Sequence, residues 1–147
     1  MTTKVPRLFL NGPAPTKRWL IVLVTGPREY NDVWMVYHTL DFIHNEWRIA
    51  SLVHGAAQGA DTLAEQWAKL NGVPVDPFAA EWEKHGKKAG AIRNRLMFQA
   101  TKPNLVVGFT HGGSCGPGTA DMLKFANQRR ALIALPDDGL MEVPSDG

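Results

Sequence analysis

The sequence contains one cysteine, Cys115, so the chain forms no intramolecular disulfide, and a lone cysteine suits a reducing compartment. No apolar run approaches the roughly 18 residues of a membrane-spanning helix. The apolar stretch over residues 8–10 is too short for the core of a signal peptide. There are 16 lysines and arginines against 14 aspartates and glutamates, with no basic stripe, which counts against a nucleic-acid surface. We therefore expect a cytoplasmic protein that contacts neither a membrane nor nucleic acid.

Sites for metal ions and for nucleophilic catalysis are also lacking. The five histidines are scattered and Cys115 has no second cysteine beside it, so the ligand spacing of a zinc site is absent. No serine or cysteine lies in the Gly-x-Ser-x-Gly setting of a nucleophile elbow. We expect no bound metal and no resident cofactor.

The 147 residues are enough for one domain with a buried core. Residues 1–18 and 137–147 are rich in proline, glycine or acidic residues and are interpreted as an arm and a tail around a domain over 19–136. In that domain, strand-length apolar runs at 19–24, 50–54, 73–78, 105–110 and 131–135 alternate with helical patterns. The helices are expected from 32 onward and over 60–70, 89–100 and 119–129, with 79–88 irregular. This alternation predicts a Rossmann-like α/β fold, in which helices cover both faces of a mostly parallel five-stranded sheet.

Glycine clusters come directly after the first, second and fourth expected strands, over residues 25–28, 55–59 and 112–119. Ligands of such sheets bind at the carboxyl ends of the strands. Glycine lets a backbone approach a phosphate closely, and the free N–H groups of a helix N-terminus favour an anion. The loop over 112–119 is not a Walker A loop, since no Gly-Lys-Ser/Thr follows, and not a dinucleotide fingerprint, since it follows the fourth strand. Taken alone, it is equally a phosphate cradle or a plain turn.

Two charged residues near these loops have competing interpretations. Asp61 falls in the first turn of a helix, where a carboxylate is stabilised by the helix dipole, and this structural role is favoured over ligand contact. Arg93 carries a planar, permanent charge that suits a phosphate, although taken alone the solvated helix arginine is the favoured interpretation.

Taken together, these segments resemble the SLOG superfamily, named for its SMF/DprA and LOG (lonely guy) branches, and most closely its small YspA or cpYpsA-related branch. The resemblance covers roughly residues 19–136. It rests on Thr25-Gly26-Pro27-Arg28, His54-Gly55-Ala56-Ala57-Gln58-Gly59-Ala60-Asp61, Trp82 through Met97, and Gly112-Gly113 through Met122. It implies a Rossmann-like fold, a pocket for a nucleotide or a nucleotide-derived signal such as ADP-ribose or an NAD derivative, and assembly into a homo-oligomer.

The LOG branch hydrolyses the N-glycosidic bond of nucleoside 5′-monophosphates with a glutamate in Gly-Gly-x-Gly-Thr-x-x-Glu and an arginine in Arg-Lys-x-x-Met. Here Arg93 and Met97 keep the second spacing, with Asn94 in place of the lysine. Met122 stands where the glutamate belongs, and a thioether is neither a general acid nor a base. Asp121 is adjacent, but one step along a helix turns a side chain by about 100°.

We therefore expect a nucleotide-binding protein in which Arg93 or Arg28 neutralises a phosphate and Trp82 stacks on a base. One alternative is an N-glycosidase that uses Arg93 and Asp121, or else Glu81 or Glu83. Another is a DNA-binding module like that of the SMF/DprA branch, which the near-neutral charge disfavours. The expected ligand-binding residues are Thr25, Gly26, Arg28, Gly55, Gly59, Asp61, Trp82, Arg93, Asn94, Gly112, Gly113, Gly116, Gly118 and Thr119.

Overall fold

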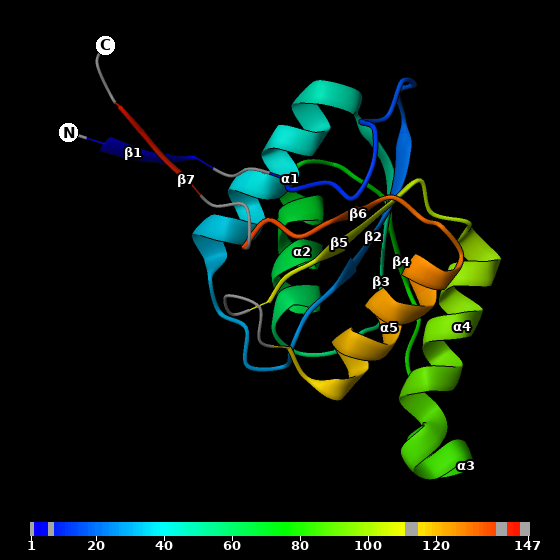
Figure 1. Ribbon diagram of the computed structural model, residues 1–147. Coiled ribbons are helices and arrows are strands. Elements are labelled where there is room, and N and C mark those ends of the chain that lie inside the picture. The colour runs from blue at the N-terminus through cyan, green and yellow to red at the C-terminus, as the bar shows by residue number, and fades with distance from the viewer. Residues whose placement is uncertain (1, 6–7, 111–114, 138–140, 145–147) are drawn as a thin grey trace.

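The computed structural model describes residues 2–5, 8–110, 115–137 and 141–144. Within these residues the chain alternates strands and helices, as the apolar pattern predicts (Figure 1). The elements in chain order are β1 (Thr2–Val5), β2 (Leu20–Thr25), α1 (Val33–Trp47), β3 (Ile49–His54), α2 (Ala60–Leu70), β4 (Val75–Pro77), α3 (Trp82–His85), the 3-10 helix η1 (Gly86–Lys88), α4 (Ala89–Thr101), β5 (Leu105–Gly108), α5 (Pro117–Gln128), β6 (Ile133–Ala134) and β7 (Met141–Pro144).

The central sheet has five strands in the order β4-β3-β2-β5-β6, and every neighbouring pair is parallel. Helices α1 and α2 cover one face and α4 and α5 cover the other (Figure 1). Successive residues of β2 supply both cores, because Val22 and Val24 pack on the α1–α2 side and Leu23 on the α4–α5 side. The predicted Rossmann-like α/β fold is confirmed.

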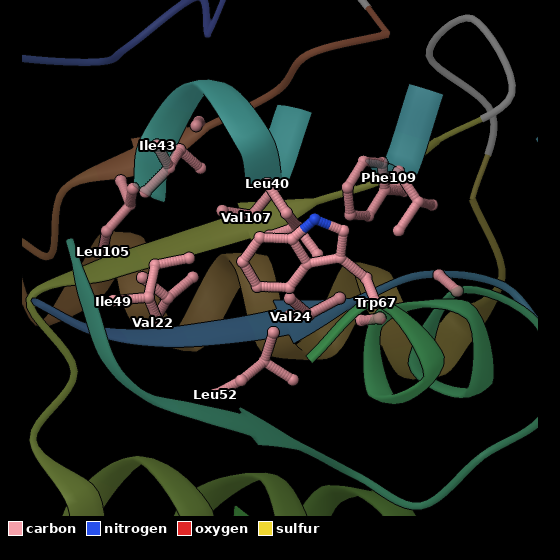
Figure 2. Packing of buried hydrophobic residues seen from close by; sticks show 14 of the residues in the cluster. Val22, Val24, Leu40, Ile43, Ile49, Leu52, Trp67, Leu105, Val107 and Phe109 are labelled. Carbon is pink, nitrogen blue, oxygen red and sulfur yellow. The ribbon is translucent and has the colours of Figure 1, made fainter. Parts of the chain in front are cut away.

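Trp67 fills the centre of the core between α1, α2 and the sheet (Figure 2). Its indole is 1% exposed and lies among Val24, Leu40 and Leu52. The indole N–H donates to Asp41 Oδ1 at 2.8 Å, so its one polar atom is satisfied. This packing holds α2 against β2, the strand that precedes the first glycine cluster.

Two helices differ from the sequence prediction. Residues 79–88 were expected to be irregular, but α3 and η1 lie there. Neither element buries a residue, so they leave no apolar periodicity to recognise, and α3 ends at Gly86 with φ of +59°. Helix α5 begins at Pro117 rather than at 119, because proline is favoured in the first helical turn.

The first and last strands lie side by side. Strand β1 pairs antiparallel with β7 in a ribbon that extends away from the central sheet (Figure 1). Closer to the domain, Leu8 is buried in the core, and Asn11 and Ile133 exchange hydrogen bonds in which the Asn11 side chain accepts at 2.8 Å. Residues 8–11 are thus tied to the edge of the sheet, and the division of the chain at residues 18 and 136 stays a prediction.

Charge is segregated between the two faces of the sheet although the whole chain is nearly neutral. Residues 29–76, which include α1 and α2, hold seven acidic and two basic side chains. Residues 82–131, which include α4 and α5, hold two acidic residues and nine basic ones: Lys84, Lys87, Lys88, Arg93, Arg95, Lys102, Lys124, Arg129 and Arg130. A basic face therefore exists that the chain's net charge hides, and the absence of a nucleic-acid partner stays a prediction. None of the helices in the described ranges is both long and apolar enough to span a membrane.

Candidate functional site

The expected site residues gather at one edge of the sheet, where β2, β3 and β5 end and α2 and α5 begin (Figure 1). Parallel strands bring these turns together, although they are far apart in the sequence. Gly112 and Gly113 lie outside the described residues. The others follow β2 (Thr25, Gly26, Arg28), follow β3 or begin α2 (Gly55, Gly59, Asp61), lie on α3 and α4 (Trp82, Arg93, Asn94), or begin α5 (Gly116, Gly118, Thr119).

Asp61 holds the turn after β3 through side-chain hydrogen bonds to its backbone. Its side chain is buried, and Oδ2 accepts the N–H groups of Gly55 at 3.0 Å and Ala57 at 3.2 Å. The other carboxylate oxygen, Oδ1, is buried without a hydrogen-bond partner in the described part of the chain. Burial raises the pKa of Asp61 to about 6, against the opposing influence of His54, Arg93 and the two amide groups. Asp61 therefore holds a loop in place and keeps one acceptor unused.

Arg93 reaches from α4 across to the same turn. Its Nη1 donates to the carbonyl oxygens of Gly55 and, at 3.4 Å, of Phe78. Burial lowers the pKa of Arg93, Asp61 opposes that shift, and the nearby Arg28 lowers the pKa further. Arg28 and Arg93 are thus close enough to repel one another, and neither forms an ion pair with any described acidic residue.

Three glycines allow these segments to approach so closely. A Cβ added at Gly26 would lie 2.5 Å from Ala60 Cβ. Gly59 has φ of +78°, and a Cβ there would lie 2.3 Å from the carbonyl oxygen of Pro27. A Cβ at Gly55 would lie 2.5 Å from Arg93 Nη1. Packing alone therefore accounts for glycine at these positions, and their contact with a ligand stays a prediction.

Asn94 connects Arg93 to the beginning of α5. The buried Asn94 amide accepts from Arg93 Nε at 2.9 Å and donates to Gly118 O at 3.2 Å and to Asp121 Oδ2 at 3.1 Å. Asp121 Oδ2 also accepts from Arg95 at 3.3 Å. The side chain of Asn94 is therefore occupied in positioning its neighbours.

No side chain of the described residues caps the first turn of α5. Its N-cap, Gly116, provides no side-chain hydrogen bond, and Thr119 is buried within the turn. Such an uncapped N-terminus attracts anions. Met122 is fully buried in the core with Leu23 and Val53, so its side chain points away from this edge.

Trp82 lies beside the site on α3. Its ring is half exposed and covers Gly90, where an added Cβ would be 3.5 Å from the indole. Gly90 and Arg93 are neighbours on one face of α4, so the indole lies one helical turn from Arg93. Glu81 and Glu83, the other acidic candidates, are exposed beside Trp82 in a shallow hollow lined by residues 80–84.

Sequence reasoning missed a cluster formed by Tyr30, Thr110 and Asp137. Asp137 accepts the Tyr30 hydroxyl at 2.7 Å through Oδ2 and the Thr110 N–H at 2.8 Å through Oδ1. Burial raises the pKa of both Asp137 and Tyr30. These bonds anchor the residue at which the loop after β5 begins. The available signal was the position of Asp137 directly after the last expected strand, at the carboxyl end of the sheet.

Comparison with known proteins adds two matches. Residues 20–85 match the family described as the YspA, cpYpsA-related SLOG family. The chain is also similar to the Gene 61 protein of Mycobacterium phage D29, with 40% identity over 101 residues that cover 65% of this chain and 80% of that protein. No solved structure matches the chain significantly. The matched family region includes the turns after β2 and β3, with Arg28, Gly55 and Asp61.

Proposed function

This chain belongs to the YspA, cpYpsA-related SLOG family, and on that premise we propose that it binds a phosphorylated nucleotide, or a nucleotide-derived signal such as ADP-ribose. The observation that carries the proposal is the reach of the Arg93 guanidinium to the turn after β3, with Arg28 near enough to act on it and neither arginine in an ion pair with an acidic residue of the described ranges. Two guanidinium groups that repel one another are stabilised when an anion binds between them. A phosphate group is the anion that suits this position.

The beginning of α5 supplies further support for a phosphate. Gly116 and Gly118 have no atom of the described residues within 4 Å of an added Cβ, so nothing in that part of the chain blocks a ligand there. The uncapped first turn favours negative charge in the same region as the two arginines. The sequence adds two proposed ligand-binding residues, Gly112 and Gly113, and backbone N–H groups near Gly113, Gly118 and Thr119 are proposed to hold the phosphate.

Trp82 is proposed to stack on the base. Its half-exposed ring lies one helical turn from Arg93, so one ligand bridges the arginine and the ring when its phosphate and base lie at opposite ends. The chain is also proposed to form a homo-oligomer, and the exposed Leu96 on α4 provides an apolar contact for it. Light scattering coupled to gel filtration measures the subunit number directly.

An N-glycosidase activity is the second candidate, because Asn94 links Asp121 to Arg93 through two hydrogen bonds. This places a carboxylate next to the proposed phosphate site. The ion pair from Arg95 and the buried Met122 weigh against it, since the first occupies the carboxylate and the second removes the LOG-type glutamate.

The test is a thermal-shift panel of AMP, ADP, ATP, ADP-ribose, cyclic ADP-ribose and NAD, followed by HPLC of each sample. A ligand at 100 times its dissociation constant adds about 2.7 kcal/mol, which shifts a domain of this size by several degrees. We expect a shift with the ligand recovered intact. No shift with any compound contradicts the proposal, whereas free base that disappears in Asp121→Asn establishes the enzyme.

Two variants connect the shift to the site. Arg93→Ala removes a charged hydrogen-bond donor and is expected to weaken binding by about 1.5–3 kcal/mol. Lys124→Ala, an exposed cation on α5, removes the same charge away from the turn and serves as the control. Equal affinity of both variants would remove Arg93 from the site.

A further inference from the structure

One oxygen of the buried Asp61 carboxylate has no hydrogen-bond partner in the described chain. Asp61 is 4% exposed, and a buried acceptor without a hydrogen-bond partner costs free energy. Its other oxygen already satisfies two backbone N–H groups of the turn after β3. The turn is therefore fully supported by Oδ2, and Oδ1 contributes nothing to it.

The chemistry of Oδ1 restricts what it can bind. A carboxylate oxygen accepts hydrogen bonds and repels anions, so its partner is a hydroxyl or amine and never a phosphate oxygen. Because the two oxygens share one carbon, Oδ1 lies at the same turn as Gly55. The Arg93 guanidinium lies against Gly55 on that turn, and Arg28 is near enough to affect Arg93. A hydrogen-bond acceptor and two phosphate-binding cations thus share one small region.

We propose that Asp61 selects ribonucleotides, through a hydrogen bond from a ribose hydroxyl of the ligand to Oδ1. In a nucleotide the ribose hydroxyls are the donors next to the phosphate, whereas the amino group of the base lies at the far end near Trp82. A phosphate held by Arg93 where it lies against Gly55 brings the neighbouring ribose to the turn that Asp61 supports. This inference rests on the proposed function.

The experiment compares ligands that differ by one donor, with affinities measured by calorimetry at pH 7.5. The probes are AMP, 2′-deoxy-AMP, 3′-deoxy-AMP and IMP, together with ADP-ribose. Loss of a hydrogen bond to a charged acceptor is expected to weaken binding by about ten- to a hundredfold for one of the two deoxy compounds. IMP, in which a carbonyl oxygen and an N1–H group replace the amino group and bare N1 of the adenine, is expected to bind as AMP does.

Asp61→Asn tests the residue. The single oxygen of the asparagine is needed by the N–H groups of Gly55 and Ala57, so its NH₂ group takes the place of Oδ1 and removes the acceptor. We expect AMP and the deoxy compounds to bind this variant equally. Asp76→Asn, which changes the same charge at an exposed position on β4, is the control and is expected to keep the discrimination.

Protonation gives a second measurement on the unaltered protein in case Asp61→Asn does not fold. His54 on β3 and Arg93 on α4 are the other charged or titratable groups that act on Asp61. Protonation of these groups or of the phosphate changes the affinity of AMP and of the deoxy compounds by the same factor. The ratio of the AMP affinity to the deoxy affinity therefore reports only the hydrogen bond to Oδ1. We expect the ratio of AMP to deoxy affinity to fall towards one at pH 5, where Asp61 is protonated.

The outcomes separate the two proposals. If neither AMP nor ADP-ribose binds, the proposed function fails. If AMP and both deoxy compounds bind equally, the function stands and the role of Asp61 is wrong. The role of Asp61 is also wrong if Asp61→Asn still binds AMP more tightly than the deoxy compounds, or if IMP is the one analogue that binds more weakly than AMP. In either case another residue recognises the donor of the ligand.

Discussion

Gly55 and Arg93 occupy complementary space, since a Cβ added to the glycine would lie 2.5 Å from Nη1 of the arginine. The atom in the way is the far end of a long side chain, and the backbone of Gly55 does not have a positive φ. An alanine at this position therefore displaces the guanidinium without breaking the fold.

Gly55→Ala is expected to cost at most about 1 kcal/mol of stability and to weaken nucleotide binding about as much as Arg93→Ala does. Calorimetry and urea unfolding measure the two effects. Gly12→Ala, where the nearest atom would be an ordinary 3.6 Å away, is the matched control and is expected to change neither. Full affinity in Gly55→Ala would show that the position of Arg93 over the turn does not matter for binding.

Gly59→Ala is expected to destabilise the fold severely, by more than about 3 kcal/mol. Its Cβ would lie 2.3 Å from the carbonyl oxygen of Pro27, which is backbone and has little room to move, and its φ of +78° disfavours any side chain. Gly118→Ala on α5 meets none of the described atoms within 4 Å and is expected to stabilise by up to about 1 kcal/mol through helix propensity. Urea denaturation of both variants decides, and similar midpoints would contradict the packing role of Gly59.

The sequence predicts those parts of the molecule that repeat a local pattern. Neighbouring residues are enough to recognise the apolar runs of β2, β3 and β5 and the apolar stripe of α2. Once the strands are expected to be parallel, the glycine clusters that follow them are expected to meet at one edge of the sheet. Helix α3 was missed because none of its four residues is buried, so no periodicity reveals it.

Contacts between distant residues were not predictable from such patterns. Arg93 was predicted to bind a phosphate from its residue type and from the family resemblance, which stays a prediction, but its contact with Gly55, 38 residues away, depends on how α4 packs. Asp137 was assigned to a tail from the local composition, and its hydrogen bond with Tyr30, 107 residues earlier, leaves no trace in a local pattern. The net charge of +2 likewise hides the segregation of charge, because the acidic residues on the α1–α2 side and the basic residues on the α4–α5 side nearly cancel. The fold shows that the two groups lie on opposite faces of the sheet.

Asp61 is expected to make stability depend on pH in an uncommon direction. Its pKa is about 6 in the folded chain against 3.8 in the unfolded chain, so between pH 4 and 6 the folded state binds the proton first. Stability should therefore rise as pH falls through this window, and above pH 6 the ionised carboxylate costs about 3 kcal/mol. Unfolding of the protein and of Asp61→Asn measures the difference between the two pH curves. A flat difference from pH 4 to 7 would contradict the raised pKa.

Tyr30→Phe is expected to destabilise the protein by about 1–3 kcal/mol. Burial raises the pKa of Tyr30, so the hydroxyl stays protonated and donates to Asp137, and its loss leaves a half-buried carboxylate oxygen with one donor fewer. Tyr37→Phe, whose hydroxyl has no hydrogen bond in the described chain, is expected to stay within about 0.5 kcal/mol of the parent. A double-mutant cycle with Asp137→Asn measures the coupling, and additive effects would show that the two groups do not interact.

Met122→Glu tests whether the fold needs only the missing LOG-type glutamate to become a hydrolase. The Met122 side chain is fully buried against Leu23 and Val53, so a glutamate there would place an unpaired charge in the core. We expect a loss of at least about 3 kcal/mol in urea unfolding and no adenine released from AMP on HPLC. Ala120→Glu, an exposed position in the first turn of α5, is the control and is expected to be neutral or slightly stabilising, because a carboxylate there favours the helix dipole. A stable Met122→Glu that releases adenine would mean that α5 presents this position to the site after all, and that one substitution separates a binder from an enzyme.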